Sequence, residues 1–167
     1  MKRLFLWLAF GAAVAGLGAC KPETSLLPAP AWSLTDVDGR IVTSDQFKGK
    51  VVVMNFWATW AGPCTEETPG YVALQKKYAA DGLVIIGASG DHGTDEVKKF
   101  IKRYGVDYPI IMCDDKIQDA FGGVDAYPTT FIIDRDGMIR DRHRGSLAPA
   151  EFERRLAPYL NSDGGGK

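Results

Sequence analysis

The sequence predicts a single α/β domain, mainly because two residue patterns alternate along the chain. Apolar runs of strand length, at 51–58 and 83–89, lack polar alternation, which is typical of parallel strands buried on both faces. Amphipathic stretches of helical spacing separate these runs. A length of 167 residues suits one sizeable core and not two. The net charge of −1 gives no basic excess for binding nucleic acid.

The first 20 residues predict export and not a membrane span. Lys2-Arg3 precedes the apolar run 4–17, which is shorter than the ~20 residues that a transmembrane helix needs. The run ends in Leu-Gly-Ala-Cys at Cys20, which resembles a bacterial lipobox, whose cysteine becomes the lipidated first residue of the mature protein. Residues 1–20 are therefore predicted to be a lipoprotein signal peptide, with Cys20 anchoring the protein to the outer side of a bacterial membrane. An ordinary cleavage site beside an unmodified Cys20 is the alternative.

The boundaries of the domain follow from composition. Residues 21–31 are rich in Pro and Ala and predict an extended tether. The segment 32–42 alternates apolar and polar residues around the turn Asp38-Gly39, so the domain is expected to open with a β-hairpin. Residues 161–167 form a Gly-rich tail with nothing to bury, which predicts disorder. The folded domain is thus expected to span 32–160.

The elements after the first buried strand follow from the same patterns. A helix is expected after Cys64 with a kink near Pro69, and a hairpin is expected around the turn at 134–137. Gly122-Gly123 ends a short helix. The further predicted elements are a helix at 95–104, a short strand at 108–112, a short helix at 116–121, strands at 129–133 and 138–144, and a final helix at 149–160.

The stretch from Val51 to Cys64 is the centre of the predicted site. It delivers Cys64 to a helix N-terminus at the carboxyl end of a strand, where the helix dipole favours a thiolate. The run Phe-Trp-Ala-Thr-Trp at 56–60 with Pro63-Cys64, and Tyr127-Pro128 followed by Thr-Thr-Phe-Ile-Ile-Asp, resemble the TlpA/ResA-like branch of the thioredoxin-like thiol-disulfide oxidoreductases (redoxins). The resemblance implies a thioredoxin fold: a central mixed sheet flanked by helices, with an N-terminal hairpin and an inserted αβ unit.

The motif departs from that family at one position. The family has Cys-x-x-Cys, in which the first cysteine attacks a partner disulfide and the second resolves the mixed disulfide. Cys64 matches the resolving cysteine, whereas Ala61 occupies the position of the attacking one. The usual dithiol cycle therefore cannot run between these two positions.

Three explanations of Ala61 are open. It was introduced in place of a natural cysteine, for instance to trap a complex. It is natural, and the domain binds partners without exchange or uses Cys64 alone. Or Cys113 replaces the missing cysteine. A disulfide needs Cα atoms within ~7 Å, and Cys113 follows a strand expected at the sheet's periphery, so we expect Cys113 to be too far from Cys64 and to be a small packed residue.

The resemblance also implies a substrate site. The bond before Pro128 is expected to be cis, with the backbone beside it pairing with an extended substrate segment; an ordinary trans turn proline is the alternative. Trp60, Gly62, Pro63, Tyr127 and Thr129 are expected to border this groove.

Other polar and aromatic residues near the motif have weaker assignments. Asp91 and His92, in the loop after 83–89, are candidates for proton transfer, with a solvated loop as the alternative. Glu66 and Glu67 are expected to complement the helix dipole, and Trp57 is expected to be core.

The functional expectation is a membrane-anchored, extracytoplasmic or periplasmic disulfide reductase that lacks its attacking cysteine. It needs neither cofactor nor metal, acts as a monomer, and has exported proteins with thiols or disulfides as partners, apocytochrome c among them. The alternatives are a redox-inactive module that binds extended segments and a one-cysteine peroxidase using Cys64. The peroxidase is the weakest, because peroxiredoxins, which share the fold, place Thr where Ala61 stands.

Overall fold

The computed structural model describes residues 27–160. The predicted signal peptide, the lipidation site at Cys20 and the tail 161–167 lie outside the described residues. No helix within 27–160 combines the length and apolar character needed to span a bilayer. The elements are β1 (Leu27–Pro28), β2 (Ser33–Thr35), β3 (Ile41–Thr43), the 3₁₀ helix η1 (Ser44–Phe47), β4 (Val51–Trp57), α1 (Gly62–Tyr78), β5 (Leu83–Ser89), α2 (Thr94–Tyr104), β6 (Ile110–Met112), α3 (Asp115–Ala120), β7 (Thr129–Ile133), β8 (Met138–Arg144) and α4 (Pro149–Leu160).

A mixed sheet of order β1-β8-β7-β4-β5-β6 forms the middle layer. β4 is parallel to β5 along its whole length and antiparallel to β7, and β5 is parallel to β6. All seven residues of β4 are buried, which explains why its sequence lacks polar alternation. The predicted α/β class and the thioredoxin-type arrangement of a central mixed sheet flanked by helices are confirmed.

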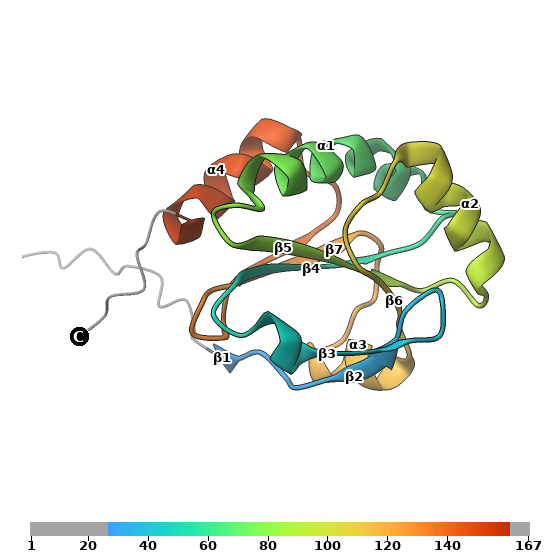
Figure 1. The fold of residues 1–167 in the computed structure, drawn as a ribbon, viewed down its shortest axis with the longest axis horizontal. Helices are drawn as coiled ribbons and strands as arrows, with labels where there is room; N and C mark the ends of the chain where they lie inside the picture. Colours follow the sequence, from blue (N-terminus) through green and yellow to red (C-terminus); the bar gives the residue numbers. More distant parts are fainter. Residues whose placement is uncertain (1–26, 161–167) are drawn as a thin grey trace, which may run out of the picture.

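Successive residues of β4 point to opposite faces of the sheet. Val51 and Val53 pack in the cluster formed with α1 and α4, whereas Met54 and Phe56 pack in the cluster formed with α3 and β7. Figure 1 shows the resulting layers, with α1 and α4 on one side of the sheet and α3 with the β2–β3 hairpin on the other. A third cluster connects the carboxyl end of β4 to α2 and contains Cys64.

The N-terminal boundary differs from the sequence prediction. The tether was predicted to reach residue 31, whereas the sheet begins at β1, where Leu27 pairs with Ile139 of β8. The N–H of Ala29 also donates to the C=O of Gly137 at 2.8 Å. Residues 27–31 therefore belong to the fold, and the tether prediction is wrong for this part. A two-residue edge strand containing Pro28 has no periodicity by which the sequence could predict it.

Candidate functional site

The site lies where the chain leaves the carboxyl end of β4 and enters α1. Ala61 is the N-cap of α1, with extended φ and ψ of −88° and 107°, and its C=O accepts the N–H of Cys64 at 3.0 Å. Gly62 and Pro63 form the exposed first turn, where a proline is tolerated because its missing N–H would have had no helical partner. Cys64 is thus held at the helix N-terminus by backbone geometry, as predicted from the sequence.

The side chain of Ala61 is buried at the N-terminus of α1. Only 8% of the residue is exposed, and it packs in the same cluster as Trp57 and Cys64. A methyl group has neither a proton to release nor a lone pair for attack on a disulfide. The position at which the family has its attacking sulfur therefore carries no nucleophile in this chain.

Cys64 is a free thiol shielded from solvent. Its exposure is 3%, and burial raises the pKa of the thiol to about 11, with the charges of Glu67 and Asp91 adding to the increase. A backbone hydrogen bond from Ala58 acts in the opposite direction. Because the thiolate is the nucleophile, a thiol with this pKa reacts slowly near neutral pH. These properties suit a resolving cysteine and not an attacking one.

Glu67 lies inside the protein, one turn of α1 after Cys64. It is 6% exposed, and its Oε1 accepts the N–H of Leu147 at 2.6 Å. Its Oε2 is buried without a hydrogen-bond partner in the described chain. Burial raises the pKa of this carboxyl to about 7, with the Leu147 hydrogen bond acting against the rise. The first turn of α1 contains no acidic residue, so the expectation that Glu66 and Glu67 complement the helix dipole there is wrong; Glu66 is exposed and Glu67 is buried.

Asp91 anchors the turn that carries the motif. Its carboxylate accepts the Thr59 N–H at 3.0 Å, the Thr59 hydroxyl at 2.6 Å and the Ser89 hydroxyl at 2.8 Å. These bonds tie the turn after β4 to the end of β5. His92, the next residue, is exposed. The suggested part of Asp91 and His92 in proton transfer remains a prediction.

A cis peptide bond joins Tyr127 to Pro128, as expected from the resemblance. The C=O of Pro128 accepts the Gly145 N–H at 2.8 Å, and the Thr129 hydroxyl donates to the C=O of Ala126 at 2.7 Å. Thr129 is only 1% exposed, so its side chain faces the interior of the loop, and its place at the border of the groove remains a prediction. Within residues 27–160 the N–H and C=O of Tyr127 have no backbone partner, which leaves an edge on which an extended segment can pair.

Trp60 and Tyr127 form the exposed rim of the site. Trp60 is 70% exposed, and its ring meets that of Tyr127 edge-on, with 5.7 Å between the centroids. Tyr127 also packs against the cluster that contains Ala61 and Cys64. The predicted border of Trp60, Gly62, Pro63 and Tyr127 is thus gathered at one end of the sheet. Trp57 is 4% exposed, in agreement with a core role.

Cys113 forms a side-chain hydrogen bond with Tyr127, which also packs against the cluster that contains Cys64. Cys113 follows β6 at the sheet edge, with β5 between β6 and β4, so about 10 Å separates the two strands. It is a partly buried free thiol packed against the core cluster of Phe56. Burial raises its pKa to about 11, while a hydrogen bond with Tyr127 lowers it. Cys113 is packed as predicted and does not replace the missing cysteine by a disulfide to Cys64.

A buried cluster of three hydrogen-bonded polar side chains, which the sequence analysis missed, connects the elements that carry the site. The Asn55 amide donates to the Thr130 hydroxyl at 2.9 Å, and the Tyr71 hydroxyl lies 3.0 Å from the same oxygen. The three residues belong to β4, β7 and α1, and thus fix the helix carrying Cys64 against the strand following Pro128. The asparagine in an otherwise apolar strand was the available signal, since a buried amide requires partners.

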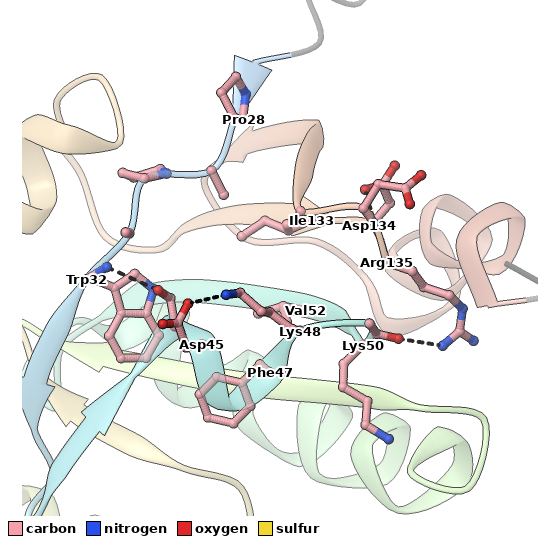
Figure 2. A pocket seen from close by; sticks show the side chains of 17 residues that line it. Pro28, Trp32, Asp45, Phe47, Lys48, Lys50, Val52, Ile133, Asp134 and Arg135 are labelled. Atoms are coloured by element: carbon pink, nitrogen blue, oxygen red, sulfur yellow. Dashed lines mark hydrogen bonds and ion pairs between the residues drawn. The ribbon is translucent and has the colours of Figure 1, made fainter. Parts of the chain in front are cut away.

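Two further observations concern metal ligands and the cavity at the other end of β4. No cluster of three or more His, Cys, Asp or Glu side chains suited to a metal ion occurs within the described residues. A cavity of about 450 Å³ lies at the amino end of β4, away from Cys64, and Figure 2 shows Trp32, Phe47, Val52 and Ile133 lining it. None of its lining residues is a cysteine or histidine. This cavity therefore offers no group for thiol chemistry.

A cysteine at a helix start beside a cis-proline loop on this sheet defines a redoxin-type protein. The family model described as the AhpC/TSA family matches residues 27–142. The thioredoxin-like protein YneN of Bacillus subtilis is 38% identical over 131 residues, which cover 77% of this chain and 76% of that protein. The thiol-disulfide oxidoreductase ResA of Bacillus thuringiensis (strain Al Hakam) is 36% identical over 127 residues, covering 75% and 72% of the two chains.

Solved structures agree with these relatives. The crystal structure of a thiol:disulfide interchange protein of the thioredoxin family from Chlorobium tepidum TLS has a TM-score of 0.76 and 34% identity, and the match covers 81% of this chain and 97% of that one. A putative thiol:disulfide interchange protein DsbE from Chlorobium tepidum gives a TM-score of 0.73 at 29% identity, covering 80% and 96% of the two chains. The chain belongs to the AhpC/TSA redoxin family, among its thioredoxin-like thiol-disulfide oxidoreductases.

Proposed function

We propose that this chain is the thiol-disulfide exchange domain of a lipid-anchored extracytoplasmic protein, in a form that binds its partners but lacks the attacking sulfur. The observation that carries the proposal is the state of Cys64, which is buried, has a thiol pKa raised to about 11 and lies one helical turn from Ala61. A thiol in this setting resolves a mixed disulfide but does not start one.

The complete reaction requires a thiolate at position 61. That thiolate attacks one sulfur of a partner disulfide, a mixed disulfide forms, and the partner's other sulfur leaves as a thiolate. The Cys64 thiol then loses its proton and attacks the sulfur at position 61, which releases the partner as a dithiol and leaves a 61–64 disulfide. Glu67 is the buried acid–base group in the electrostatic field of Cys64, and its pKa of about 7 suits acceptance of that proton. With Ala61 the first step is absent.

The binding part of the function does not need that sulfur. The unpaired backbone of Tyr127, the cis bond to Pro128 and the exposed ring of Trp60 are all present with Ala61 in place. These features favour a second candidate function, a redox-inactive module that holds extended segments of exported proteins. A peroxidase based on Cys64 is disfavoured, because such an enzyme needs a reactive thiolate and the pKa of this thiol is raised.

The anchor and the partners are part of the same proposal. The lipobox-like sequence ending at Cys20 supports a lipid anchor that holds the protein on the extracytoplasmic side of a bacterial membrane. Partners are then exported proteins with thiols or disulfides, and apocytochrome c is a candidate through the resemblance to the TlpA/ResA-like branch. Replacing Cys20 with Ala should abolish the incorporation of radiolabelled palmitate into the protein. Unchanged labelling would contradict the lipid anchor.

The decisive experiment restores the missing sulfur. Ala61→Cys should reduce insulin disulfides in the presence of a chemical reductant, whereas the chain with Ala61 should give no rate above background. Ala61→Cys with Cys64→Ser should accumulate mixed disulfides with the partner, since the resolving thiol is gone. A folded Ala61→Cys protein without exchange activity would refute the exchange function and leave the binding module.

A further inference from the structure

The indole of Trp60 is a large apolar surface at the rim of the site. It is 70% exposed, and among the described large apolar side chains only Leu27 and Ile41 are exposed to a similar extent. Its ring contacts that of Tyr127, the residue whose unpaired backbone N–H and C=O precede Pro128. Exposed aromatic side chains of this size are enriched where a partner binds. Trp60 therefore offers an apolar contact surface next to Tyr127 for a bound segment.

A hollow of about 360 Å³ adjoins the indole, between Trp60 and the start of α2. Its titratable lining consists of carboxylates from Asp91, Asp95 and Glu96 and the imidazole of His92, with neither Lys nor Arg. Asp91 accepts hydrogen bonds only from uncharged donors, so its charge is not neutralised. Asp95 has no ion pair within the described chain, whereas Glu96 is paired with Lys99 at 2.5 Å. Three carboxylates therefore line the hollow against one neighbouring cation, Lys99, whose charge acts on both Glu96 and Asp95, so the wall keeps a net negative charge.

We propose that Trp60 and Asp95 form a subsite for a cationic side chain, so that the preferred substrates carry Arg or Lys within two residues of the reacting cysteine. The inference rests on the proposed docking of an extended segment beside Pro128. A strand advances ~3.3 Å per residue, so a side chain one or two positions from the cysteine lies over the rim that Trp60 forms. A guanidinium or ammonium there stacks on the indole face and faces the charge of Asp95. An acidic residue at the same place is repelled.

The inference can be tested by equilibrium binding to the chain as it stands, with Ala61, because binding needs no exchange. Three labelled peptides share one extended sequence around a blocked cysteine and differ only in Arg, Gln or Glu two residues from it; fluorescence anisotropy gives each Kd. The Arg peptide should bind about tenfold more tightly than the Glu peptide at low salt, given the ordinary strengths of exposed ion pairs and cation–π contacts. The preference should shrink as salt is added.

Matched variants locate the effect. Asp95→Asn should reduce the Arg-to-Glu preference about threefold, and Trp60→Leu should weaken Arg more than Gln. Asp136→Asn removes the same charge from an exposed turn beyond the opposite end of β4 and should leave the preference unchanged. Equal Kd values for Arg and Glu, or equal effects of Asp95→Asn and Asp136→Asn, overturn this inference alone. Failure of all three peptides to bind overturns the docking site and this inference with it.

Discussion

Replacing Glu67 with Gln should remove the part of the pH dependence of the unfolding free energy that comes from this one carboxyl. Burial raises the pKa of Glu67 from an ordinary 4.5 to about 7 in the folded protein, so folding favours the neutral acid. The stability that the neutral carboxyl gives to the folded state is fully present below about pH 4.5 and is lost as the pH rises through 7. At higher pH the free energy of unfolding no longer changes through this group. The difference between the two pKa values corresponds to about 3 kcal/mol of unfolding free energy.

Gln retains an oxygen for the Leu147 N–H and places an uncharged group where Oε2 lies without a partner. It therefore resembles protonated Glu67 at every pH. The free energy of unfolding, measured by urea titration with tryptophan fluorescence, should be nearly equal for the two proteins near pH 4.5. At about pH 8 Glu67→Gln should be the more stable by about 3 kcal/mol. Comparing the two proteins at each pH cancels the other titrating groups.

Glu66→Gln is the control, since Glu66 is the exposed neighbour on the same helix. Its stability curve should run parallel to that of the parent. Parallel curves for Glu67→Gln as well would refute the assignment of a raised pKa to this carboxyl. In a Cys113→Ser background, Glu67→Gln should also lower the pKa of Cys64, because the Glu67 charge contributes to raising it, and ultraviolet absorbance of the thiolate measures that change.

Three further substitutions test the packing around the site. Phe56→Ala should cost about 3–5 kcal/mol in urea unfolding, since Phe56 is fully buried between two other phenylalanine rings; a loss below about 1 kcal/mol would contradict the described core. Asp91→Ala should cost about 2 kcal/mol and speed hydrogen exchange at the Thr59 amide, and unchanged exchange there would argue against the anchor. Arg135→Met should cost about 1 kcal/mol, because its guanidinium donates to backbone carbonyls of three separate segments, and an unchanged denaturation midpoint would show that these bonds contribute little.

Local sequence patterns were sufficient for the elements that bury continuous apolar faces. β4 and β5 were predicted as buried strands because their mainly apolar runs have strand length and lack polar alternation, and both are buried almost throughout. The cis bond before Pro128 came only from the resemblance to a family, since local chemistry favours trans. The short edge strand at Leu27 was missed because its pairing with β8 is a contact across more than a hundred residues.

The burial and hydrogen bonding of the polar groups in the site depend on contacts between residues far apart in the chain, so local sequence patterns could not predict them. Glu67 looks like a first-turn surface carboxylate, and it becomes a buried acid only because the segment around Leu147, 80 residues later, covers it. Asn55 meets Thr130 across 75 residues. A pattern of helical or strand spacing identifies which face is apolar, but the partner that covers a polar group is decided by the topology of the sheet.

The contacts that hold the site in place do not depend on a sulfur atom at position 61. Ala61 caps α1 through its backbone C=O, and no side-chain hydrogen bond from position 61 contributes to the cap. The cis loop is held by Gly145 and the turn after β4 by Asp91, and neither contact involves the side chain at 61. A cysteine at 61 therefore adds one sulfur atom to a binding surface already in place. Comparing Ala61 with Ala61→Cys then measures the chemistry alone, because peptide affinity should be the same in both while only the cysteine form exchanges disulfides.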